Sequence, residues 1–128
     1  MILRHLQLIF VIKVEREHRS KEVSRIIAEL AHSTVIVEGK HDVDALASLG
    51  IAAITEGSIA RNSIDGKVFL LMDNDRRGMQ RRERLYNKLL EMDKEIRIDV
   101  ASGERLQKML NITSIEQLCR PVREAMQR

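Results

Sequence analysis

Two short stretches decide the expected fold, VIVEGK at residues 35–40 and LLMDNDRRG at residues 70–78. In each stretch an apolar run ends directly in an acidic residue, and a glycine follows within a few positions. Uninterrupted apolar runs of this kind are typical of parallel strands that are buried on both faces of a sheet. We therefore predict buried strands over Thr34 to Val37 and Val68 to Met72, each with acidic side chains at its carboxyl end.

The segments around these two strands alternate between helical and extended patterns. The expected helices are Glu22 to His32, Asp42 to Leu49, Gly78 to Met92 and two short C-terminal ones; the other expected segments are strand Ile51 to Thr55, polar loop Glu56 to Gly66 and strand Ile96 to Val100. Strands that alternate with helices predict an α/β fold with right-handed crossovers. The expectation is a Rossmann-like, three-layer fold with a mainly parallel central sheet of about four to five strands and helices on both faces.

The N-terminal run Leu6 to Val14 is apolar except for Gln7 and Lys13. It is shorter than the about 20 residues that span a bilayer, and a charged segment follows it, so no membrane association is expected. We predict a buried strand here. An apolar edge strand would also make a homodimer plausible.

Composition gives the broad limits. The 128 residues are 44% apolar and 32% charged, with a formal net charge of +3. This is a globular balance, and it predicts one domain over residues 1–128. Within this domain, we expect an N-terminal strand and helix at 2–32 and a helical tail at 101–128. Cys119 is the only cysteine, which excludes an internal disulfide or a zinc ribbon and fits a reducing, cytoplasmic location.

The acidic residues at the strand ends suggest a metal site. Glu38 follows the first strand, and Asp73 and Asp75 follow the second. Carboxyl ends of parallel strands meet at one edge of the sheet, and side chains two apart on an extended segment point the same way. Three converging carboxylates suit a hard divalent cation such as Mg²⁺, with Mn²⁺ as a substitute. The alternative is that each acid caps a helix or faces water.

In combination, the two stretches resemble the signature of the Toprim family, the catalytic domain shared by topoisomerases, bacterial-type primases, ribosomal-RNA maturases and some nucleases. The resemblance covers about residues 33–100 and is strongest toward small stand-alone Toprim proteins. It implies that Glu38 acts as general acid or base and that Asp73 and Asp75, with Glu38, hold magnesium. Thr55-Glu56-Gly57 falls where the family often has a glycine-bearing loop.

Several residues near the acids are candidates for binding phosphate or nucleic acid. Gly39, Gly57 and Gly78 would allow close backbone approach, and the helix start at Gly78 would offer free N–H groups. Arg77, Arg81, Arg84 and Lys88 recur at helical spacing and form one basic stripe, to which Arg76 and Lys40 add charge. The alternative for these cations is a solvated helix face, and Asp42 is expected to cap a helix or support the site.

Aromatic residues are scarce: two phenylalanines, one tyrosine and no tryptophan. Base-stacking platforms are therefore expected to be largely missing, and contact with nucleic acid should be directed to the backbone. Tyr86 is expected to lie mid-helix near the buried face, which argues against an autonomous topoisomerase, and no room remains for the accessory domains of a primase. Met72, Met79 and Met92 are expected in the core.

Two functions follow from these features. The first is magnesium-dependent phosphodiester chemistry on RNA or DNA, as in a nuclease or an RNA-processing factor. The second is a non-catalytic adaptor that binds nucleic acid or a larger nucleic-acid-processing partner. A purely structural acidic cluster is a third interpretation.

Overall fold

The computed structural model describes residues 2–61, 64 and 66–127. The chain runs in the order α1 (Ile2–Ala31), β1 (Thr34–Val37), α2 (Lys40–Ala47), β2 (Ala53–Thr55), η1 (Glu56–Arg61), β3 (Lys67–Leu71), α3 (Arg76–Met92), β4 (Arg97–Asp99), α4 (Ala101–Met109), η2 (Ile115–Gln117) and α5 (Cys119–Met126). The predicted polar loop at residues 56–66 contains the 3₁₀ helix η1, and its residues 62, 63 and 65 lie outside the described part of the chain.

The strands form one parallel sheet in the order β2-β1-β3-β4. The central pair is β1 with β3, in a register that places Ile36 opposite Leu70 and Val37 opposite Leu71. Both strands are predicted correctly, because a strand paired on both sides and covered on both faces needs apolar residues throughout. The α/β class with a parallel, helix-covered sheet is confirmed.

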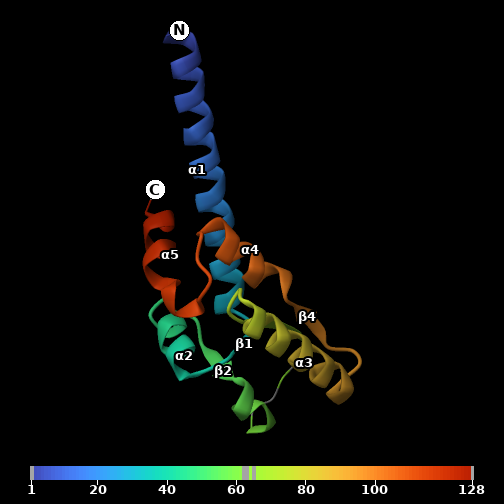
Figure 1. Ribbon diagram of the computed structural model, residues 1–128. Helices are drawn as coiled ribbons and strands as arrows, with labels where there is room; N and C mark the ends of the chain where they lie inside the picture. The colour runs from blue at the N-terminus through green and yellow to red at the C-terminus, as the bar shows by residue number, and fades with distance from the viewer. Residues whose placement is uncertain (1, 62–63, 65, 128) are drawn as a thin grey trace.

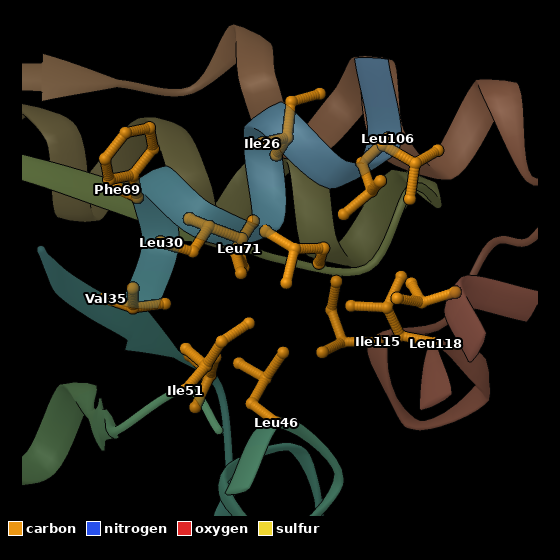
Figure 2. Packing of buried hydrophobic residues seen from close by; sticks show 14 of the residues in the cluster. Ile26, Leu30, Val35, Leu46, Ile51, Phe69, Leu71, Leu106, Ile115 and Leu118 are labelled. Atoms are coloured by element: carbon orange, nitrogen blue, oxygen red, sulfur yellow. The ribbon is translucent and has the colours of Figure 1, made fainter. Parts of the chain in front are cut away.

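Alternate residues of the central strands support two separate cores. On one face, Val35, Val37, Phe69 and Leu71 join a cluster with side chains from α1, α2, α4, η2 and α5. Figure 2 shows Ile26 and Leu30 of α1 packed close to Phe69 and Leu71, with Leu46, Ile51, Ile115 and Leu118 completing the cluster. The C-terminal segment is therefore part of this core rather than an appendage.

The opposite face of the sheet is covered mainly by α3. Ile36, Val68 and Leu70 of the sheet, with Met72 directly after β3, pack there with Leu85 and Leu89 of α3 and with Ile59 of η1. The two helix layers enclose the sheet as predicted. Because α2 and α3 pack on opposite faces, the chain turns to different sides of the sheet after β1 and after β3.

The predicted N-terminal strand is wrong, since Leu6 to Val14 lies within α1. No glycine or proline interrupts the chain before Gly39, so the helix that packs through Val23 to Leu30 continues back through the charged segment. The apolar side chains gain no burial from this. Leu8 is 58% exposed and Phe10 is 67% exposed, and Figure 1 shows this half of α1 projecting beyond the rest of the molecule.

In the part of the chain that the structure describes, no helix combines the length and apolar character needed to cross a membrane. The projecting half of α1 is apolar over a short run only, with Lys13, Glu15 and Arg16 directly after or within it.

The two halves of α1 predict contrasting effects of the same substitution. Leu30 is fully buried against the sheet, whereas Leu8 is 58% exposed. Leu30→Ala should lower the free energy of unfolding by about 2–5 kcal/mol, because it leaves a cavity in the core. Leu8→Ala should change it by less than about 0.5 kcal/mol. Urea unfolding followed by circular dichroism would measure both, and equal losses would contradict the described packing of α1.

Candidate functional site

The acidic residues lie at the point where the sheet changes winding direction. From β1 the chain passes through α2 to β2 on one side, and from β3 it passes through α3 to β4 on the other. In open parallel sheets, the crevice between two such strands at their carboxyl ends is the usual ligand site. Glu38 directly follows β1, and Asp73 is the second residue after β3, so the register brings both to this crevice.

Glu38 is engaged with the basic helix beside it. Its Oε1 lies 3.1 Å from Nη1 of Arg81, and both side chains are about one-quarter exposed. An ion pair with this access to water contributes little to stability, typically under about 1 kcal/mol. The ion pair therefore holds Glu38 in place, but Glu38 and Arg81 can each leave it to bind another group.

The two aspartates are held by backbone N–H groups. Asp73 Oδ1 accepts a hydrogen bond from the N–H of Ile115 at 3.0 Å. Asp75 caps α3, and its Oδ1 accepts from the N–H of Gly78 at 2.7 Å. Among the described residues, the second oxygen of each carboxylate makes no hydrogen bond or ion pair. Each aspartate thus keeps one oxygen available.

Gly78 serves packing rather than open phosphate access. A Cβ at this position would lie 2.0 Å from the carbonyl oxygen of Asp73, a separation that only a backbone shift could relieve. Its N–H is already donated to Asp75. The expectation that the helix starts at Gly78 with free N–H groups is wrong, since it starts at Arg76 and the N–H of Gly78 is not free to meet phosphate. The glycine instead lets α3 start directly beside the acidic loop.

The other predicted glycines are less constrained. Gly39 is the residue before α2, and its N–H donates to Oδ2 of Asp42 at 3.3 Å. Gly57 lies in η1 and is exposed. A Cβ at either position would meet nothing within 4 Å, so neither is required by close contact in this structure.

Asp42 lies close to the same acids and is only 8% exposed. It is the third residue of α2, where its carboxylate faces back to the N–H of Gly39, so it supports the turn after β1 without being the N-cap. Burial raises the pKa of Asp42, the hydrogen bond from Gly39 opposes this, and the charges of Asp73, Glu116 and Glu38 raise it further. The carboxyl ends of the strands thus form a region of concentrated negative charge.

The C-terminal segment clamps the acidic loop, which the sequence did not reveal. Gln107 is 2% exposed; its Nε2 donates to the carbonyl of Met72 at 2.8 Å, and its Oε1 accepts from the N–H of Asn74 at 3.0 Å. That same N–H also lies 2.7 Å from the carbonyl oxygen of Thr113. With the bond from Ile115 to Asp73, three residues of the tail fix the position of the loop. A lone glutamine in an amphipathic helix gave no signal of this role.

The donor chemistry fits magnesium in a restricted sense. All three predicted ligands offer carboxylate oxygens, which Mg²⁺ prefers. However, the described residues contain no three His, Cys, Asp or Glu side chains grouped closely enough to hold one ion together. Magnesium often binds through one or two carboxylates and completes its shell with water and phosphate. The residues present fit an ion of that kind and do not form a closed protein cage.

The basic stripe borders the site. Arg77, Arg81 and Arg84 line one cavity of about 640 Å³ together with Gln80, Glu83 and Asn87. Arg76 lines a different cavity on the neighbouring face of α3. Lys88 is exposed but does not line either cavity, and Lys40 is exposed at the start of α2. Of the predicted basic stripe, only Arg77, Arg81 and Arg84 line this cavity, and Arg81 already contacts Glu38.

Three expectations for side chains on and before α3 have different outcomes. Met72 is buried, as predicted. Met79 and Met92 are 49% and 58% exposed, so their assignment to the core is wrong. Tyr86 is 37% exposed and lines the same cavity as Arg76, rather than lying against the buried face. The helical phase explains this, because Gly78, Leu85 and Leu89 mark the buried face.

Comparison with known proteins adds one structural likeness. No protein-family model matches the chain, and no curated protein matches it. A solved structure of a protein from Aquifex aeolicus, with no stated activity, is similar with a TM-score of 0.59 and 26% sequence identity. The match covers 73% of this chain and 95% of that one. This likeness supports the α/β fold with a parallel sheet described above.

The raised pKa of Asp42 predicts a pH-dependent stability. An acid whose pKa is higher in the folded than in the unfolded protein stabilises the fold while protonated, and this contribution is lost as the pH rises from its ordinary value of 3.8 through the raised value. Asp42→Asn keeps an acceptor for Gly39 but does not titrate. In metal-free buffer, the free energy of unfolding of the natural protein, relative to that of Asp42→Asn, should therefore fall across this pH range. A constant difference, measured by urea unfolding, would contradict the raised pKa.

Proposed function

We propose that this chain is a magnesium-dependent protein of nucleic-acid metabolism that carries out phosphodiester chemistry, as a nuclease or an RNA-processing factor. The observation that supports this most is the position of Glu38 and Asp73 at the switch between β1 and β3, beside three arginines of α3. Acidic oxygens for a metal and cations for phosphates lie next to each other there. The resemblance of residues 33–100 to the Toprim signature points in the same direction.

The roles of the residues follow from their surroundings. Asp73 and Asp75 each have one uncommitted oxygen and would hold the ion, with Glu38 nearby. Magnesium, when bound, would polarise the phosphodiester and position it for attack. Arg81 is weakly paired with Glu38 and would move to a phosphate oxygen when a strand arrives, which releases Glu38 to accept or donate a proton. Arg77 and Arg84 would hold the neighbouring phosphates.

A cleavage assay tests this proposal. Labelled single-stranded and structured RNA and DNA would be incubated with Mg²⁺ or Mn²⁺ and with the natural protein, Glu38→Gln or Asp73→Asn. We expect metal-dependent cleavage that falls by at least about 100-fold in Glu38→Gln, the size of a typical general acid–base contribution. Thermal unfolding of each variant provides the control for folding. Cleavage at the natural rate by a folded Glu38→Gln protein would refute the assigned role.

The second candidate function is a non-catalytic adaptor that binds nucleic acid or a larger partner. One observation favours it: each acid already has a protein partner, and the described residues contain no group of three metal ligands. In this case the natural protein would bind strands without cutting them. Arg84→Glu should then abolish binding, whereas Arg120→Glu, the same change on α5 at the other face of the sheet, should not. Binding that survives Arg84→Glu would count against the adaptor.

Self-association is also part of the proposal, now through a helix in place of the predicted edge strand. The projecting half of α1 carries seven large apolar side chains that are 40–67% exposed, among them Leu6, Ile9 and Phe10. Apolar patches of this extent commonly mark contact sites.

We also place the protein in a reducing compartment such as the cytoplasm, in line with the lone Cys119.

A homodimer built on α1 should depend on Phe10. Sedimentation equilibrium should give a dimer for the natural protein and a monomer for Phe10→Glu, because burying an unpaired charge in an apolar contact is costly. Lys21→Glu, a charge change at an exposed position closer to the body, serves as the control. A natural protein that is monomeric throughout the concentration range would exclude the dimer.

A further inference from the structure

One face of α3 borders a cavity of about 780 Å³, and apart from Asp75 none of its lining residues has a role in the chemistry proposed above. Its lining includes Tyr86, Met79 and Val100, together with Gln80 and Asn74. Tyr86 is 37% exposed and Met79 is 49% exposed. The cavity therefore presents an accessible aromatic ring and a thioether to solvent, directly beside the acidic loop that contains Asp75.

The charges around this cavity favour an uncharged occupant. Asp75 and Glu83 are balanced by Arg76 and Arg82, so the lining carries no net formal charge. Arg82 is also paired with Glu104 at 3.6 Å. An aromatic ring with amide groups nearby suits a flat group with apolar faces and polar edges, since Gln80 and Asn74 each offer a donor and an acceptor. A nucleobase has this chemistry.

The adjacent face of α3 has the opposite character. The cavity lined by Arg77, Arg81 and Arg84 shares Gln80 and Glu83 with the first one, so α3 forms a ridge between the two. Three arginines and one glutamate leave an excess of positive charge on this side. A single nucleic-acid strand has the same division, with flat neutral bases along one side and charged phosphates along the other.

We propose that α3 binds a single nucleic-acid strand, with one base stacked on Tyr86 and the phosphates beside Arg77, Arg81 and Arg84. The inference rests on the proposed function and names its substrate class, an unpaired strand. Tyr86 lies ten positions after Arg76, about 15 Å along the helix axis. The stacked base therefore belongs to a nucleotide beyond the one at the acidic residues. The exposed ring supplies the stacking platform that the sparse aromatic composition argued against.

The composition of the chain provides a direct reporter. Tyr86 is the only tyrosine and the chain has no tryptophan, so intrinsic fluorescence arises chiefly from this cavity. The full chain would be titrated, without divalent metal, with short oligothymidylate, with oligouridylate and with an abasic strand carrying the same number of phosphates. After correction for absorbance by the strand, we expect a base-containing strand to quench Tyr86 and to bind about tenfold more tightly than the abasic strand.

Variants separate the ring from the charges. Fluorescence anisotropy of labelled strands measures binding by each variant. Tyr86→Ala should bind base-containing and abasic strands equally, whereas Tyr86→Phe should keep the preference for bases. Arg84→Glu should weaken the binding of both kinds of strand to the same extent. Equal affinity for abasic and base-containing strands, with unchanged Tyr86 fluorescence, overturns the base site. Since no metal is present, this result would leave the cleavage proposal standing. Base-dependent binding by a protein that never cleaves supports the base site and overturns the phosphodiester chemistry.

Discussion

The parallel pairing of β1 with β3 is the interaction on which the rest of the molecule depends. Its register sets Val37 opposite Leu71, and this alone brings Glu38 and the loop of Asp73 to one edge of the sheet. The same pairing divides the core, because alternate residues of the two strands face the α1 side and the α3 side. A shift of one residue would turn every one of these side chains to the wrong face.

The acidic loop after β3 is held from three directions, and this explains why it can keep concentrated negative charge in place. Gly78 lets α3 begin against the carbonyl of Asp73, and the N–H of Gly78 donates a hydrogen bond to the carboxylate of Asp75. From the opposite side of the sheet, Gln107 and Thr113 hold the backbone of Asn74. Backbone N–H groups and the guanidinium of Arg81 offset part of the repulsion among the carboxylates.

Helix α3 connects the core to the candidate functions. Leu85 and Leu89 bury one face, Arg77, Arg81 and Arg84 border a basic cavity on the second, and Met79 and Tyr86 line a neutral cavity on the third. The helix axis begins at the acidic loop, so both exposed faces lead away from the same point. α1 is different, since its C-terminal half is part of the core, whereas residues 4–19 in its N-terminal part are all exposed.

The sequence by itself determined the central strands, their acidic ends and the α/β class, because burial on both faces demands uninterrupted apolar runs and leaves a local signature. It also located the arginines of α3, since helical spacing depends only on local geometry. The tertiary structure decided what depends on distant partners: the clamp of Gln107 on Asn74, the pairing of Arg81 with Glu38, and the exposure of Tyr86 and Met79. It also decided that Leu6 to Val14 is helical, because an apolar run without alternation fits a buried strand or a helix equally well, and only its continuity with the packed part of α1 distinguishes the two.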